Sequence, residues 1–151
     1  MKCRSCGFNQ EEIFLDLGKQ PPANNYLLNT DDLKKEFRIP LQLFLCKKCY
    51  LVQTKDYIKP EMLFSKDYAY LSSVSSSWVQ HAKKLKHKLV SKFKLSKQDI
   101  ILEIASNDGY LLDFFVKDGF KNCFGIEPTH IAAQIARKKK IEVVEEFFSL
   151  N

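Results

Sequence analysis

The segment IILEIASNDG, residues 100–109, is the stretch that decides the fold class. Its first five residues form a short apolar run of the kind found in buried parallel strands. The next five residues are typical of a turn. Beyond it, the pattern predicts a helix over 110–117, a strand over 123–126, a helix over 129–140 and a strand over 141–144. This alternation predicts an α/β fold with the beginning of a parallel sheet.

The cysteines predict a metal site at the other end of the chain. Four of the five cysteines form two C-x-x-C pairs, Cys3 with Cys6 and Cys46 with Cys49. We expect no disulfides, because the N-terminus has no export signal and the cytosol keeps thiols reduced. Two such pairs supply four thiolates for a closed, structural zinc site, and the alternatives are two unrelated pairs or one redox pair. The fifth, Cys123, lies among apolar residues and is expected to be a buried, inert thiol.

Three regions are expected. Residues 1–55 form a small zinc-ribbon-like module, in which 41–45 and 51–54 make a hairpin that turns at the second cysteine pair. Residues 56–98 hold an aromatic and Ser-rich segment and then an amphipathic, Lys-rich helix over 78–93, whose start Ser77 could cap. Residues 99–151 form the incomplete α/β region. We expect the helix lysines, including Lys86, to be mostly solvent-exposed.

Composition excludes several classes. The 151 residues are 45% hydrophobic and 28% charged, which is typical of a globular protein. No apolar run approaches the roughly 18 residues of a membrane helix, so we expect a cytoplasmic protein without a membrane partner. Residues 1–98 carry a net charge of +9 and residues 99–151 one of −3. The basic part allows a zinc-ribbon nucleic-acid or protein interaction module as an alternative function, but the helix lysines have no arginines among them, so we do not expect nucleic acid as a partner.

The spacing of two acidic residues suggests a nucleoside cofactor. In open α/β sheets, ligands bind at the carboxyl ends of the strands. Glu127 ends the second strand, 24 residues after Glu103, where a carboxylate can accept hydrogen bonds from ribose hydroxyls. The intervening turn has Gly109 but lacks the other glycines that a pyrophosphate requires. S-adenosylmethionine is therefore favoured over NAD; an NAD-linked oxidoreductase and an ordinary turn remain the alternatives.

Six ordered motifs give the sequence a family resemblance. They are CRSCG, LDLGKQPPANNYL, PLQLFLCKKCYLVQ, DYAYLSSVSSSWVQHAKKL, ILEIASNDGYLLDFF and GIEPTHIAAQIA. Together they resemble the S-adenosylmethionine-dependent C-methyltransferases that act on nucleotide-linked deoxysugars. The resemblance implies a zinc module, a class I Rossmann-like methyltransferase domain and a further α/β domain. It also implies proton removal beside a sugar ketone and attack of the resulting enolate on the cofactor's methyl group.

The resemblance also implies residue roles. The zinc ligands would be Cys3, Cys6, Cys46 and Cys49. Glu127 would hold the ribose and Pro128 would frame the adenine, while the segment with Tyr68 and Tyr70 would fold over cofactor or sugar. We assign to Tyr70 the stabilisation of the developing oxyanion. The methionine end of the cofactor would be lined by Glu103, Ala105, Ser106, Asn107, Asp108 and Gly109.

The chain ends at Asn151, inside the expected methyltransferase domain. A chain truncated there would lack the family's proton-abstracting region and be inactive alone. We expect an unpaired edge along residues 100–104 and poorly packed helix faces around Leu111, Phe115 and Ile135. Such surfaces predict self-association or a complementing polypeptide.

Overall fold

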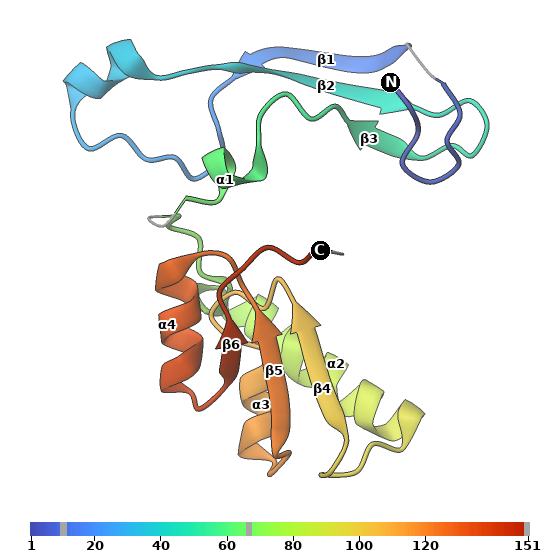
Figure 1. Cartoon of the computed structure of the whole chain (residues 1–151), viewed down its shortest axis with the longest axis vertical. Coiled ribbons are helices and arrows are strands. Elements are labelled where there is room, and N and C mark those ends of the chain that lie inside the picture. Colours follow the sequence, from blue (N-terminus) through green and yellow to red (C-terminus); the bar gives the residue numbers. More distant parts are fainter. Residues whose placement is uncertain (10–11, 66–67, 150–151) are drawn as a thin grey trace. The chain divides into compact units, whose positions relative to one another are not determined.

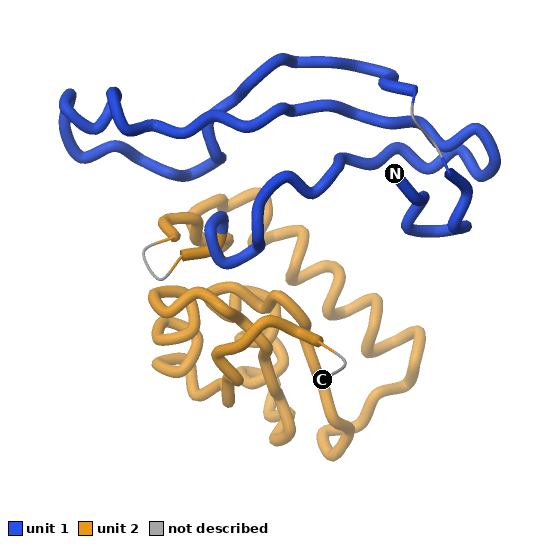
Figure 2. The backbone as a smooth tube through the Cα atoms, turned by 45° about the horizontal axis from the view of Figure 1, so that its top comes forward, with its two compact units in different colours: residues 1–63 blue, residues 64–151 orange. Residues whose placement is uncertain are grey.

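The computed structural model describes residues 1–9, 12–65 and 68–149 (Figure 1). It divides into two compact units, residues 1–63 and 64–151, which Figure 2 shows in blue and orange. The C-terminal positions 150–151 of the expected α/β region, and positions 66–67 of the aromatic segment, lie outside the described residues. Each unit is described by itself below.

The first unit contains a three-stranded antiparallel sheet in the order β1-β2-β3. Strand β1 spans Ile13–Gln20, β2 spans Ile39–Leu45 and β3 spans Val52–Thr54. The expected hairpin is confirmed, since Phe44 of β2 lies opposite Gln53 of β3. Between β1 and β2 lies the 3-10 helix η1 (Thr30–Lys35), and the short helix α1 (Pro60–Leu63) ends the unit.

The second unit has the expected β-α-β-α-β order. Its elements are η2 (Ser72–Val74), α2 (Ser76–Phe93), β4 (Ile100–Ile104), α3 (Leu112–Lys117), β5 (Asn122–Ile126), α4 (His130–Lys138) and β6 (Glu142–Val144). The three strands form a parallel sheet in the order β4-β5-β6. The expectation of a parallel sheet is therefore confirmed.

The core of the second unit lies between one face of this sheet and the helices. Ile101, Cys123 and Val143 point from successive strands into an apolar cluster that includes Leu112 and Phe115 of α3. Cys123 is buried, as expected, and its burial raises the pKa of the thiol. Alternation along the strands places the neighbouring residues on the opposite face. There Ile100 is 72% exposed and Leu102 54% exposed.

The structure corrects three expectations about packing. Ser75, not Ser77, caps α2, because its Oγ accepts the backbone N–H of Trp78 at 3.3 Å. Lys86 is only 4% exposed and pairs with Asp118, so it does not belong to a solvated face. The helix faces around Phe115 are well packed rather than poorly packed, since Phe115 is buried in the core.

The edge of β4 carries no further strand within residues 1–9, 12–65 and 68–149, where β4 pairs only with β5. Over the same described ranges, no helix is both long enough and apolar enough to cross a membrane.

Candidate functional site

The four cysteines of the two C-x-x-C pairs come together in the first unit. Their sulfur atoms all lie within 4.8 Å of one another, although the pairs are far apart in the sequence. The Sγ atoms of Cys3 and Cys49 are 3.6 Å apart, as are those of Cys6 and Cys46. Tetrahedral zinc with Zn–S bonds of about 2.3 Å holds its sulfurs about 3.8 Å apart, so the cluster fits that ion.

The two cysteine pairs form matching turns. The backbone N–H of Gly7 donates to the carbonyl of Cys3 at 3.0 Å, and that of Tyr50 donates to Cys46 at 2.8 Å. Both Gly7 and Tyr50 have a positive φ, of 71° and 61°. Backbone N–H groups within the second turn point at the Cys46 sulfur and, against its burial, lower the pKa of that thiol to about 6. The backbone is thus shaped to hold a thiolate.

In the second unit, the loop after β4 turns through three left-handed residues. Ala105, Asn107 and Gly109 have φ values of 57°, 49° and 73°. Packing also favours glycine at position 109, because a Cβ there would overlap the end of the Ile141 side chain and crowd Ala136. Side chains at Ala105 and Asn107 thus stand where a dinucleotide loop has glycine, in a conformation that costs an ordinary residue about 1–2 kcal/mol.

Asn107 holds this loop against the segment before α2. Its Oδ1 accepts the backbone N–H of Ser72 at 2.8 Å, and its Nδ2 donates to the Tyr70 carbonyl at 3.1 Å. Its own backbone N–H donates to Glu127 Oε2 at 2.9 Å. One side chain therefore joins residues that lie 35 or more positions apart.

Glu127 is the buried acceptor at the end of β5. Besides the Asn107 bond, its Oε1 accepts the backbone N–H of Thr129 at 2.9 Å and also the Thr129 hydroxyl. A carboxylate offers about four acceptor positions, so one remains for a ligand hydroxyl. Thr129 stands at the start of α4 but makes no cap bond with its side chain, because its hydroxyl is bound to Glu127.

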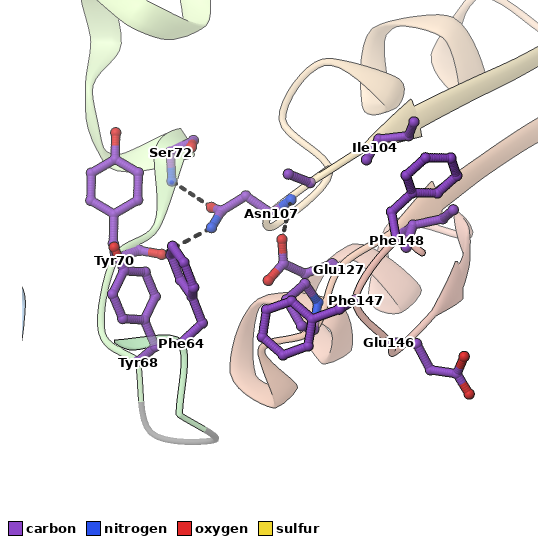
Figure 3. A pocket seen from close by; sticks show the side chains of 13 residues that line it. Phe64, Tyr68, Tyr70, Ser72, Ile104, Asn107, Glu127, Glu146, Phe147 and Phe148 are labelled. Atoms are coloured by element: carbon purple, nitrogen blue, oxygen red, sulfur yellow. Dashed lines mark hydrogen bonds between the residues drawn. The ribbon is translucent and has the colours of Figure 1, made fainter. Parts of the chain in front are cut away.

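These residues border a pocket of roughly 370 Å³ at the carboxyl ends of β4 and β5. In Figure 3 the rings of Phe64, Tyr68 and Tyr70 stand on one side, with Phe147 on the other and Asn107 and Glu127 between them. The rings of Phe64 and Tyr68 meet edge to face, with centroids 5.1 Å apart. The pocket is thus mostly apolar, with several aromatic rings and few polar groups, which is the usual character of a site for a nucleoside-sized ligand.

The expected cofactor residues fall into two groups. Tyr68, Tyr70, Ala105, Asn107, Glu127 and Pro128 line the pocket. Glu103, Ser106, Asp108 and Gly109 do not line it, although they belong to the same strand and loop. Tyr70 is 47% exposed, and in Figure 3 its hydroxyl points away from Glu127.

Sequence reasoning missed the aromatic wall after β6. Phe147 and Phe148 line the pocket, and the Phe147 ring lies 6.4 Å from that of Phe64. Their position directly after the third strand could have indicated this role, because the carboxyl ends of neighbouring parallel strands lie at the same edge of the sheet, where ligands bind.

Comparisons with known proteins match both parts of the chain. Residues 3–64 match a family described as "Putative zinc binding domain". Over 148 residues, 98% of the chain, the sequence is 30% identical to "C-methyltransferase NovU" of Streptomyces niveus. The chain spans 35% of that protein's length. The resemblance to C-methyltransferases predicted from the six motifs is thereby confirmed.

Proposed function

Since this chain is similar to a C-methyltransferase over nearly all its residues and matches a zinc-binding domain family over residues 3–64, we propose that it serves S-adenosylmethionine-dependent C-methylation. Its second unit would be the cofactor-binding start of a Rossmann-like methyltransferase domain. The substrate would be a nucleotide-linked keto-deoxysugar. Zinc would have a structural role in the first unit.

The observation that carries this proposal is the pocket beside Glu127. A buried carboxylate with one acceptor position left suits a ribose hydroxyl, and the aromatic rings of Phe64, Tyr68 and Phe147 suit a purine. The side chains of Ala105 and Asn107 disfavour a pyrophosphate but leave room for a nucleoside without one. These features support S-adenosylmethionine over a dinucleotide.

The cofactor supplies an electrophilic methyl group when bound. The chain's own residues would bind and orient it: Glu127 would accept the ribose hydroxyl, and Pro128 would border the base. Tyr70 would donate a hydrogen bond to the sugar oxygen on which negative charge develops as an enolate forms, for which its hydroxyl would have to turn toward that oxygen.

The experiment is calorimetric titration of the full chain with S-adenosylhomocysteine, NADH and a nucleotide-linked ketosugar. We expect S-adenosylhomocysteine to bind at least tenfold more tightly than NADH. Phe147→Ala should weaken S-adenosylhomocysteine binding about tenfold, because base stacking on an aromatic ring contributes about 1–3 kcal/mol. Tyr50→Ala, an exposed aromatic residue of the cysteine turn, is the matched control and should bind normally. Equal affinity for NADH, or no binding of S-adenosylhomocysteine, would contradict the proposal.

A further inference from the structure

The two cysteine turns of the first unit are attached to its sheet in different ways. The second turn is continuous with β2 and β3, and the Cys46 N–H closes it by donating to the Leu51 carbonyl at 2.9 Å. The first turn, residues 3–7, precedes all three strands. Within the described ranges its backbone hydrogen bonds are local, such as that from the Cys3 N–H to the Phe8 carbonyl at 2.9 Å. Apart from a metal ion, it is left to side chains to place the first turn against the second.

Gln53, in the middle of β3, connects the sheet to the first turn with both ends of its amide. Its Oε1 accepts the backbone N–H of Arg4 at 3.0 Å, and its Nε2 donates to the Lys2 carbonyl at 3.4 Å. The two bonds join residues that are 49 and 51 positions apart. Lys2 and Arg4 directly precede and follow Cys3 in the sequence. One side chain of the sheet therefore holds the backbone on both sides of a zinc-site cysteine.

The amide of Gln53 is buried where it makes these bonds. Gln53 is 6% exposed and Cys3 is 3% exposed. Gln53 lies opposite Phe44 of β2, which is also buried, so the two side chains share the covered face of the sheet. The neighbouring Val52 points to the other face and is 49% exposed. A buried amide is nearly always hydrogen-bonded, and here the first cysteine turn supplies its partners.

A second contact reaches the first turn, but it lies at the surface. The Arg4 guanidinium pairs with Asp56 at 2.7 Å, and the two side chains are 49% and 80% exposed. Exposed ion pairs contribute little, because water and salt screen them. The buried connection is made by the backbone N–H of Arg4 and not by its side chain.

We propose that Gln53 is the positioning residue of the zinc site, which holds Cys3 in place and thereby slows the loss of the ion. The inference rests on zinc as the occupant of the four-cysteine cluster, which is part of the proposed function. The Cys3 Sγ lies 3.6 Å from that of Cys49 on the other turn, so a shift of the first turn would move a sulfur out of the cluster. An amide offers one donor and one acceptor end, as the Lys2 carbonyl and the Arg4 N–H require. Groups that orient metal ligands typically contribute about 10- to 100-fold to metal affinity.

The test is the rate at which the full, zinc-loaded chain loses its ion to an excess of a chelator that gives a coloured zinc complex. Gln53→Met has a side chain of similar length without the amide, and it should lose zinc at least tenfold faster than the unaltered chain. Gln42→Met is the matched control. Gln42 of β2 also makes two side-chain hydrogen bonds, with Asp16 and Tyr57, and neither partner belongs to a cysteine turn. This control should lose zinc at about the rate of the unaltered chain.

Two further variants and a spectrum test how Gln53 acts. Gln53→Glu keeps an acceptor for the Arg4 N–H but turns a second acceptor toward the Lys2 carbonyl. It should also lose zinc faster, and it replaces Gln53→Met if that variant does not fold. Arg4→Ala removes the surface ion pair but keeps the backbone N–H, so it should retain zinc normally. With Co²⁺ at saturation, Gln53→Met should keep the absorption of a tetrahedral four-thiolate site, because Gln53 positions a ligand without being one.

The outcomes separate this inference from the rest of the proposed function. An unaltered chain that binds no zinc would overturn both the zinc assignment and this inference, and would leave the proposed cofactor untouched. Normal zinc binding with unchanged retention in a folded Gln53 variant would overturn this inference alone. Equally fast loss from Gln42→Met or Arg4→Ala would also overturn it, because zinc loss would then follow the general stability of the sheet or the surface pair. A changed Co²⁺ spectrum of Gln53→Met would do the same.

Discussion

The side-chain oxygen of Asn107 accepts the backbone N–H of Ser72 at 2.8 Å, and this bond ties the loop after β4 to the segment that carries the pocket tyrosines. The Nδ2 of the same side chain holds the Tyr70 carbonyl. Asn107 makes both bonds from a left-handed backbone conformation, with φ at 49°. Asn107 therefore fixes the loop after β4 against the segment that forms one wall of the pocket.

Asn107→Ala should destabilise the second unit by about 2–4 kcal/mol, because two hydrogen bonds are lost and the Ser72 N–H is left unpaired. Asn107→Gly loses the same bonds but accepts the left-handed φ, so it should be the more stable of the two variants. Urea unfolding followed by the fluorescence of Trp78, the single tryptophan of the chain, measures both. If Asn107→Ala unfolds at the same urea concentration as the unaltered chain, these bonds do not stabilise the loop.

Zinc removal should unfold the first unit and spare the second. Four thiolates in two matched turns make metal binding and folding one equilibrium, so the unaltered chain should hold one tightly bound zinc. Cys46→Ser should lose the zinc and the antiparallel sheet, as measured by metal analysis and amide hydrogen exchange. Cys123→Ala changes a cysteine outside the cluster and should retain the metal. Full zinc content in Cys46→Ser would contradict this assignment.

The pair formed by Lys86 and Asp118 predicts that a second substitution restores part of the stability lost through the first. Lys86 is buried on α2, whereas Asp118 is 48% exposed after α3. Asp118→Ala leaves a buried ammonium group without its partner and should cost about 2 kcal/mol. Replacing Lys86 by Met as well should restore part of that loss, because an apolar side chain of similar length needs no partner. The urea midpoints of the single and double variants decide it, and a double variant less stable than Asp118→Ala would contradict the argument.

The order of elements in the second unit could be predicted because each carries a local signal. Residues 100–104 are apolar except for Glu103 and are followed by a turn, so β4 could be placed to the residue. The apolar residues that recur at three- and four-residue steps from Trp78 onward predict the approximate bounds of α2. Lys86 could not be predicted as buried, because its burial depends on Asp118, which lies 32 residues away on another element.

The candidate site could be predicted only where spacing carries the information. Two C-x-x-C pairs define a four-sulfur cluster whatever lies between them. The loop residues were all named from one motif, but which of them line the pocket depends on the backbone path through Ala105 and Asn107, both of which have a positive φ. Local propensity favours glycine over alanine at Ala105, whereas Asn107 is a residue type that tolerates the left-handed conformation and also holds Ser72 from there.

Glu127 provides the last prediction, because its carboxylate serves both the fold and the proposed ligand. Three donors converge on it: the N–H of Asn107 and the N–H and hydroxyl of Thr129. Glu127→Gln leaves one acceptor oxygen and turns an NH₂ group toward these donors. It should therefore destabilise the second unit by about 2–3 kcal/mol, since each unpaired buried donor costs about 1–3 kcal/mol.

The control is Glu145→Gln, which also alters a carboxylate that accepts two side-chain donors, Arg137 and His130, but near the surface. It should cost less than about 1 kcal/mol. In the absence of urea, and at a temperature where both variants are folded, Glu127→Gln should bind S-adenosylhomocysteine at least tenfold more weakly than the unaltered chain. Glu145→Gln should bind it normally. Loss of stability in Glu127→Gln with unchanged affinity would mean that Glu127 braces the loop between β4 and α3 without touching the ligand.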